Sequence, residues 1–512
     1  MRFRDWLAIF GGSLGAFMAI LDIQVTNASL LNITDSLNID LSDAGWISTA
    51  YLIAEIVIIP LTAFMSKSVG LRRYLTWNCA GFLIASVLCG FSWSLGSMIF
   101  WRALQGFTGG TLIPLALQII LKLMPEKDRH IGLTIFGLTV TLAPTLGPSL
   151  GGWLTDNYGW RAIFFINIVP GILMLWSLRL GLEDTPPNYD RLKKLDVLSF
   201  VLLALGLSTL TYVIEEGPKY EWLANHSIRW ALVISIMTLP AFVFRQFELK
   251  NPLLKLELFK DRNFAFGTII TAAAGCALFS GIYALSLYLG QVQGYPASEI
   301  GKVIMWVGFP QLLVMPFLPY LMKRINLKFL AVIGILIFAA SNYLNSSLSA
   351  HFSGEQFRIS LLIRALGQPL FVIPLSVIAM GYIKKQDTED ASAIFNMMRN
   401  LGASIGIAMT TTLVMIRQGF HQARLSENIS QFDFHVLETM YKAESMFKSY
   451  GADAVTARTL AAREYLSQGF RDSMIMAFSD IFWVVGGLLL LCTVLILFLK
   501  NVDEVPEDVF NE

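Results

Sequence analysis

The sequence predicts an all-α protein that crosses a membrane many times. Of its 512 residues, 55% are hydrophobic and only 15% are charged, whereas soluble domains carry about 25% charged residues. Long apolar runs recur along the chain, and basic residues concentrate in alternate loops. A formal net charge of +1 gives no reason to expect a nucleic-acid partner.

The apolar runs define the individual elements. Each is about 18 residues or longer, which is enough for a helix to cross a hydrocarbon layer of roughly 30 Å. The first run is too long for a cleaved signal peptide and has no small-residue cleavage site after it, so we expect it to remain in the mature protein. We predict fourteen spans, at approximately 7–30, 46–66, 74–93, 98–122, 131–154, 162–181, 196–214, 229–247, 264–289, 301–322, 328–348, 359–383, 391–416 and 475–499.

The loops predict the orientation of these spans. If the amino terminus is cytoplasmic, most loop lysines and arginines lie inside, including Lys67, Arg72 and Lys323. The short outer loops then hold only Arg161, Lys219, Arg229 and Arg358. This bias is the positive-inside pattern, and an even number of spans places both termini in the cytoplasm.

An internal repeat predicts how the spans are grouped. The stretch 60–72 aligns without gaps on 316–328, and 102–107 corresponds to 364–369, which equates span 2 with span 10 and span 4 with span 12. Two similarly oriented halves are a known plan of transporters. We therefore expect a six-helix half at 1–181, two inserted helices with linkers at 182–262, and a second six-helix half at 263–512.

Span 5 carries an unusual run of glycine and proline. Pro144 and Pro148 each remove a backbone donor and bend the helix, while Gly147 and Gly151 allow another helix to approach closely. Such a helix persists in lipid when neighbouring helices cover it. An ordinary small-residue helix contact would account for Gly147 and Gly151 alone.

The same run resembles a known motif. Gly147-Pro148-x-x-Gly151-Gly152 in a fifth span matches the antiporter motif of the major facilitator superfamily at every fixed position. Three further stretches, at 21–28, 102–110 and 160–171, resemble motifs of its fourteen-span drug:proton antiporter family, the EmrB/QacA group. The resemblance covers essentially the whole chain. Ala63 and Lys67 stand where the wider superfamily has Gly and Asp, so an ion-pair gate built on that aspartate is not implied.

The resemblance implies the major facilitator fold in a bacterial cytoplasmic (inner) membrane, and proton-coupled export of drugs or other lipophilic small molecules by alternating access. Span 5 would seal the contact between the halves and prevent a proton leak. The alternatives are export of an endogenous anionic metabolite such as a siderophore, proton symport for uptake, and a channel or membrane enzyme. We find no catalytic constellation or cofactor motif and expect neither enzymatic activity nor a cofactor, and the motif in span 5 argues against symport.

Ionisable residues within spans are the candidates for proton coupling, because burying them in a bilayer costs several kcal/mol. Asp22 in span 1 and Arg102 in span 4 are both expected in the outer half of the membrane, where Asp22 could exchange protons with the outside. A permanent Asp22–Arg102 salt bridge that only joins the two spans is the alternative. Glu55, near the middle of span 2, is either the proton site itself, a partner for a cationic drug, or a carboxyl group hydrogen-bonded to a neighbouring span.

The expected substrate cavity combines aromatic and polar side chains. Phe279 and Tyr283 lie one helical turn apart in span 9, and Arg364 and Arg399 are placed to line the second half, where either could bind an anionic substrate. Asn27 and Gln105, from the family-like motifs, complete the set. The four cysteines have no metal-ligand spacing, and we expect no metal site.

The segment 417–474 is the one substantial piece expected outside the membrane, between spans 13 and 14. Its pattern predicts two helices, at 417–427 and 454–470, of which the first continues span 13. A long outer loop of this kind resembles the Gram-negative EmrB-like members, which work with a periplasmic adaptor and an outer-membrane channel. The alternative is a solvated insertion without a partner.

Overall fold

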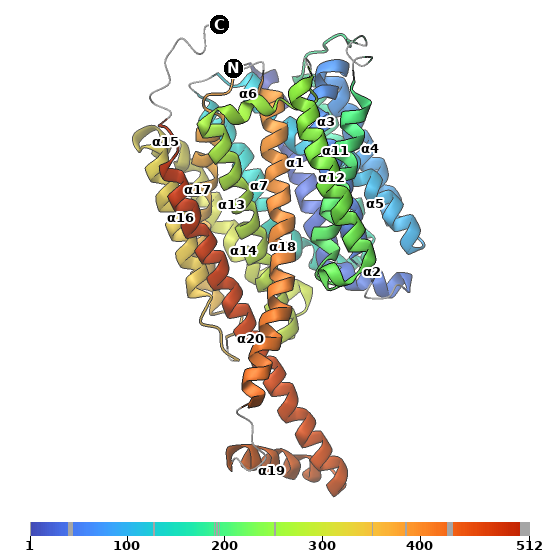
Figure 1. The fold of residues 1–512 in the computed structure, drawn as a ribbon, viewed down its shortest axis with the longest axis vertical. Coiled ribbons are helices and arrows are strands. Elements are labelled where there is room, and N and C mark those ends of the chain that lie inside the picture. Colours follow the sequence, from blue (N-terminus) through green and yellow to red (C-terminus); the bar gives the residue numbers. More distant parts are fainter. Residues whose placement is uncertain are drawn as a thin grey trace.

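The computed structural model describes residues 2–38, 43, 45–125, 128–188, 190, 193, 195–249, 252–350, 352–384, 387–427 and 434–501. Throughout this described part the chain forms helices joined by short connections, and it contains no strand. The helices stand side by side in one bundle, and the beginning of α1 and the end of α20 lie at the same end of it (Figure 1). We call this end the terminal face.

The first group of helices corresponds to the predicted spans 1 to 6. Span 4 is divided between α5 and α6, span 6 is divided between α8 and α9, and the short helix α2 was not predicted. The group comprises α1 (Phe3–Ala28), α2 (Leu30–Leu37), α3 (Trp46–Val69), α4 (Leu71–Gly90), α5 (Leu95–Gly109), α6 (Leu112–Leu123), α7 (Arg129–Tyr158), α8 (Ala162–Phe165) and α9 (Ile168–Gly181).

Two helices follow at the predicted spans 7 and 8. α11 (Val197–Glu216) and α12 (His226–Glu248) pack on one another, joined by the short η3 (Trp222–Ala224) and followed by η4 (Leu256–Lys260). At the terminal face Arg245 donates two hydrogen bonds to Asp196, of 2.6 and 2.9 Å, and this guanidinium lowers the pKa of Asp196 to about 2. α11 also packs against α3 and α18, so it connects the pair to the rest of the bundle.

The last group corresponds to the predicted spans 9 to 14. Span 9 ends in a π-helical turn, η5, and span 10 is divided into α14, η6 and α15. The group comprises α13 (Arg262–Leu287), η5 (Tyr288–Val292), α14 (Ala297–Val314), η6 (Met315–Phe317), α15 (Leu318–Arg324), α16 (Leu327–Leu344), α17 (Phe357–Met380), α18 (Thr388–Glu427), α19 (Phe434–Ser449) and α20 (Ala454–Leu497).

Helices therefore occur at each of the fourteen predicted positions, which confirms the all-helical membrane fold class. Among the described residues, twelve helical segments are long and apolar enough to cross a membrane by length and composition. The two further positions are occupied by α4 and α18. α4 carries Arg72, Arg73 and Asn78, and α18 extends well beyond its apolar part, which explains why their mean hydropathy is low.

The segment between α18 and α20 differs from the prediction. The helix predicted at 454–470 is the beginning of α20, which continues without a break to Leu497, and α19 was not predicted at all. α19 has no strong apolar stripe, and Glu438–Lys442 and Glu444–Lys448 pairs of 2.6 Å lie along it. Residues 428–433 of the predicted loop lie outside the described residues.

The ends of α18 and α20 support this projecting segment. Arg417 and His421 of α18 both contact the carboxylate of Asp480 in α20, at 2.5 and 2.7 Å. α19 packs against the first turns of α20 and projects from the bundle at the end opposite the terminal face (Figure 1). The segment is thus a helical extension of two bundle helices rather than a loop on its surface.

Two apolar cores hold the bundle together. A first core gathers buried residues from α1 to α9 with contributions from α11, α12, α13, α17 and α18, and a second gathers residues from α13 to α20. α7 packs against α1 in the first group and α14 in the last, while α18 packs against α3, α6 and α11 as well as α13 and α20. α7 and α18 are therefore the helices through which the two parts meet.

Candidate functional site

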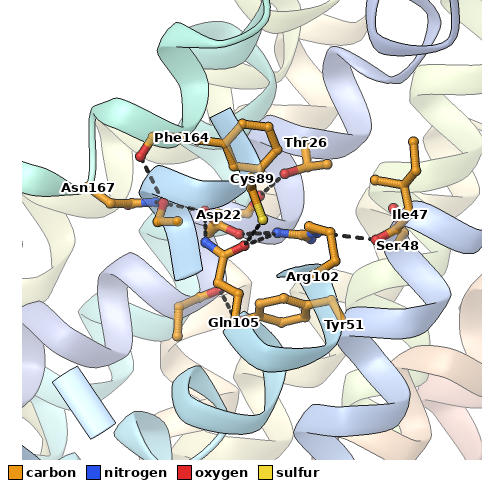
Figure 2. Close-up of polar contacts among 12 residues, drawn as sticks. Asp22, Thr26, Ile47, Ser48, Tyr51, Cys89, Arg102, Gln105, Phe164 and Asn167 are labelled. Carbon is orange, nitrogen blue, oxygen red and sulfur yellow. Dashed lines mark hydrogen bonds and ion pairs between the residues drawn. The ribbon is translucent and has the colours of Figure 1, made fainter. Parts of the chain in front are cut away.

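A buried ion pair joins α1 and α5 (Figure 2). Arg102 of α5 donates from Nη1 to Oδ2 of Asp22 in α1, at 2.5 Å, and both residues are at most 2% exposed. Oδ1 of Asp22 accepts two further hydrogen bonds, from Gln105 at 2.9 Å and from Asn167 at 2.7 Å. The carboxylate of Asp22 is therefore surrounded by three side-chain donors.

Arg102 is held on several sides as well. Its Nε donates to the carbonyl of Ile47 at 3.2 Å, and Nη1 also donates to Oε1 of Gln105 at 2.7 Å. The guanidinium lies 4.4 Å from the centre of the Tyr51 ring, a cation–π contact. Because α1, α3, α5 and α9 all supply groups, the cluster ties four helices together. Both predicted roles of this pair, proton coupling and a structural salt bridge, remain predictions.

Glu55 has a different environment from Asp22. Its side chain is 2% exposed, and its Oε1 accepts one hydrogen bond, of 2.9 Å, from Nδ2 of Asn400 in α18. Arg399 donates to Oδ1 of the same Asn400 at 3.3 Å. No basic side chain in the described part of the chain lies within ion-pair distance of Glu55, although Arg399 is near enough to interact electrostatically. The carboxyl group of Glu55 thus reaches from the first group of helices to α18.

A small cavity of about 20 Å³ lies where α7 meets α13, α17 and α18. Its lining is mainly apolar, and Arg399 is the only charged residue among the described residues that line it. The lining residues are Phe136, Gly137 and Val140 of α7, Thr271, Ala274, Gly275 and Leu278 of α13, Val372, Leu375 and Ser376 of α17, and Phe395 and Arg399 of α18. Except for Arg399, the sequence analysis did not predict these lining residues, because small and apolar residues in a sequence look like ordinary packing residues.

The other residues predicted for the cavity lie elsewhere. Gln105 belongs to the Asp22 cluster, and Asn27 accepts a hydrogen bond of 2.5 Å from Ser48. Phe279 and Tyr283 of α13 are half-buried but do not line this cavity. Their part in substrate binding therefore remains a prediction.

Arg364, the repeat partner of Arg102, also lies away from this cavity. It is 2% exposed in α17, donates to the carbonyl of Leu278 at 2.8 Å, and lies 5.0 Å from the centre of the Phe338 ring. No carboxylate in the described part of the chain forms an ion pair with it. The repeat therefore places an arginine in both cores, but only Arg102 is paired with an acid.

The Gly-Pro run of span 5 lies within α7, which is helical through both prolines. A Cβ atom at Gly151 would lie 2.8 Å from the carbonyl oxygen of Val25, and one at Gly147 would overlap Gln24. Both glycines thus face α1, and Pro148 and Gly152 are buried beside them. The close approach expected of this run occurs, and it occurs within the first group of helices.

A different face of α7 makes the contact with α14. Ser149 donates from Oγ to the carbonyl of Gly301 at 2.6 Å, and Thr145 lies against Gly308. The contact between the two parts of the bundle therefore depends on the small polar residues of the run, which the sequence did not single out.

Lys67 has acidic partners on the opposite part of the bundle. It lies 2.8 Å from Asp390 and 3.5 Å from Glu389 at the beginning of α18. Gln118 of α6 adds a hydrogen bond of 2.5 Å to Glu389, and Ser392 donates to the carbonyl of Pro114 at 2.8 Å. These contacts join α3 and α6 to α18 at the terminal face. The sequence analysis noted Lys67 as an inside-loop cation and as a departure from the family pattern, but it did not predict an acidic partner, because that partner is more than three hundred residues away in the chain.

Comparisons with known proteins agree with this architecture. The family model of the Major Facilitator Superfamily matches residues 12–407. The structure of the proton:xylose symporter XylE superposes with a TM-score of 0.59, covering 96% of this chain and 94% of that chain. Because the sequence identity is 14%, this likeness concerns the fold alone.

Relatives of similar length identify the group within the superfamily. The chain is 33% identical over 448 residues to the colistin resistance protein EmrB of Acinetobacter baumannii, covering 87% of this chain and 88% of that one. It is 29% identical over 491 residues to the multidrug export protein EmrB of Escherichia coli, covering 95% and 94%. It is 30% identical over 434 residues to the fatty acid resistance protein FarB of Neisseria gonorrhoeae, covering 85% of each. The chain therefore belongs to the Major Facilitator Superfamily, and within it to the EmrB/QacA-like group of membrane transporters.

Proposed function

We propose that this transporter exports drugs and other lipophilic small molecules across the bacterial cytoplasmic membrane in exchange for protons. The walls of the small cavity between α7, α13, α17 and α18 carry the proposal, because mainly apolar walls with a few polar groups would suit lipophilic compounds once the halves move apart and the space widens. The relatives' multidrug export and resistance functions point in the same direction. No enzymatic activity and no cofactor enter this proposal.

The contacts between the first and last groups of helices suggest how the transport cycle proceeds. Residues 1–181 and 263–512 act as two halves that rock against one another, with the pair in 182–262 attached to them. The positive-inside pattern assigns the terminal face, with both termini, to the cytoplasm. The contacts of Lys67 with Glu389 and Asp390 then close the cytoplasmic side, and they must break before the cavity opens inward.

The charge in the cavity supports a second candidate substrate class. Arg399 is the only charged residue among the described residues that line the cavity, and an arginine recognises carboxylates through paired hydrogen bonds. In the opened state, an anionic amphiphile would place its head group at Arg399 and its apolar body against the other lining residues. The fatty acid resistance of the relative FarB supports this candidate, which also includes endogenous anionic metabolites.

Transport in proteoliposomes tests both substrate classes. With an imposed pH gradient, the reconstituted protein should move ethidium, a lipophilic cation, or 8-anilinonaphthalene-1-sulfonate, an anionic amphiphile. Arg399→Gln should reduce movement of the anionic probe about tenfold relative to movement of ethidium, the equivalent of about 1.4 kcal/mol or one lost charge-assisted hydrogen bond, because any effect of the substitution through Glu55 is shared by both probes. Ser376→Ala, at another polar lining position, is the matched control. Movement of neither probe under a pH gradient would contradict the proposed function.

The projecting segment is proposed to dock a periplasmic adaptor that leads to an outer-membrane channel. α19 exposes Leu437, Tyr441 and Met446, three large apolar side chains on a helix held away from the bundle. Replacing residues 428–453 by a short Gly-Ser linker removes α19 and leaves every bundle helix intact. We expect this variant to transport normally in proteoliposomes and to lose drug resistance in cells, because substrate released into the periplasm returns through the membrane.

Two other outcomes would separate the alternatives. Unchanged cellular resistance in the α19 replacement would exclude a docking role and leave a solvated insertion. Loss of transport in proteoliposomes as well would show that α19 stabilises or gates the transporter itself.

A further inference from the structure

A second acid faces α18, and the sequence analysis did not identify it. Glu215 lies in the last turn of α11, at the end of that helix remote from the terminal face. Its side chain is half-buried, and its Oε1 is enclosed without a hydrogen-bond partner among the described residues. The carboxyl group interacts with the side chain of Ser404 in α18. An enclosed acceptor without a donor is costly unless it binds something.

The neighbouring acid, Glu216, differs from Glu215 because it has a basic partner. Glu216 accepts a hydrogen bond of 3.4 Å from Thr49 and lies 3.7 Å from Nζ of Lys219. Glu215 has no basic side chain within ion-pair distance in the described part of the chain. Oε2 of Glu216 also lacks a hydrogen-bond donor, but Lys219 lies beside it. Among the described residues, the two adjacent carboxylates therefore differ in that only Glu216 has a cation nearby.

Glu215 and Glu55 share one face of α18. Asn400, which donates to Glu55, and Ser404, which contacts Glu215, are four residues apart and so lie one above the other, about 6 Å apart along the helix. Arg399, at the cavity, precedes them. On the other side of Glu215, Tyr283 of α13 interacts with Thr411 of α18 and lies near enough to Glu215 to interact electrostatically. Polar groups thus follow α18 from the cavity toward the end of the bundle that carries α19.

We propose that Glu215 is a proton-binding site, the outer station of a relay along α18 that delivers protons to Glu55 beside the cavity. This inference rests on the proposed proton-coupled export. A proton from outside binds the Glu215 carboxylate and forms the neutral acid. It then passes to the carboxylate of Glu55, which restores the Glu215 anion, and leaves to the cytoplasm when the cavity opens inward.

The surroundings of the two acids suit these steps. Glu215 faces Glu216 on its own helix, Ser404 and Tyr283, so no cation holds it in the charged form. Glu55 faces Arg399, Asn400 and Arg102, which stabilise its anion after the proton has left. Asp22 is already fully paired with Arg102, Gln105 and Asn167, so the relay does not use it. In this proposal the inserted pair of helices takes part in proton coupling, because α11 supplies Glu215, the first acid of the relay.

The test compares Glu215→Gln with Glu216→Gln in proteoliposomes, with ethidium as the probe. Two assays are run: transport driven by a pH gradient, and exchange of labelled for unlabelled ethidium without a gradient. Glu215→Gln should slow gradient-driven transport about a hundredfold, the usual contribution of a positioned proton-transfer group. It should retain exchange and the wild-type unfolding temperature. Glu216→Gln should remain near wild type in both assays.

Each remaining outcome decides the matter. Gradient-driven transport by Glu215→Gln at the wild-type rate and with the wild-type pH profile would overturn the relay. Equal losses of transport and exchange would also overturn it, because they indicate a structural role. If wild-type protein exchanges ethidium but shows no response to a pH gradient, the proposed proton coupling itself fails, and this result is distinguishable from failure of Glu215 alone.

Discussion

Exchange of Asp22 for Asn should lower the unfolding temperature of the purified protein and, by disturbing the contact between α1 and α5, should strongly reduce transport driven by a pH gradient. The substitution removes the anion that lies 2.5 Å from Arg102 and leaves this fully buried guanidinium without a counter-charge. Breaking a buried ion pair from one side costs about 3–5 kcal/mol. Thermal unfolding in detergent and proton-driven ethidium transport in proteoliposomes measure the two effects separately.

The double variant Asp22→Asn with Arg102→Gln distinguishes the two roles of the pair. It removes both charges, so no uncompensated charge remains in the first core, and we expect stability to recover in large part. Recovery of transport together with stability would show that the pair serves only to join α1 and α5. Recovery of stability without transport would assign a functional role to the pair. Wild-type stability and activity in Asp22→Asn alone would contradict the observed geometry.

Exchange of Gly151 for Leu should prevent accumulation of active transporter. A Cβ at this position already lies 2.8 Å from the carbonyl oxygen of Val25 and 3.0 Å from its Cα, so a leucine must push α1 away from α7. Overpacking of a tight contact costs about 1–3 kcal/mol, and here the obstacle is backbone that has little room to move. Val25 follows Asp22 by one helical turn, so the displacement should also disturb the Asp22 cluster. The measurements are the amount of protein in membranes and ethidium efflux from cells.

Gly487→Leu is the matched control for this prediction. Gly487 lies in the apolar part of α20, and a Cβ there would meet nothing within 4 Å. The same chemical change should therefore leave efflux near the wild-type level. Normal efflux by Gly151→Leu would show that α1 and α7 do not pack as closely as the structure places them.

Local patterns in the sequence were enough to place the helices of the bundle. Hydropathy is a property of about twenty consecutive residues, so it can be read without knowing the fold. It located helices at fourteen positions, and the sequence then showed which acids and arginines lie within them. It failed at α19, because a helix with charged pairs along it and no strong apolar stripe resembles a polar loop. The close helix contact at the Gly-Pro run could also be predicted from the sequence. Glycine permits a close approach whichever helix supplies the partner, so the prediction needs no knowledge of that partner.

By itself, then, the sequence determined the fold class, the family and several of the buried charges, namely Asp22, Glu55, Arg102, Arg364 and Arg399, whereas the tertiary structure decided their partners. Which side chains meet depends on how each helix is rotated and how far it is shifted along its neighbours, and no local pattern encodes these quantities. For this reason the contacts of Lys67 with Asp390 and of Glu55 with Asn400 could be identified only from the folded chain. The glycines of α7 could have faced either part of the bundle, and packing turned them toward α1. Glu215 lacked any motif, and its enclosure against Ser404 exists only because α11 packs on α18.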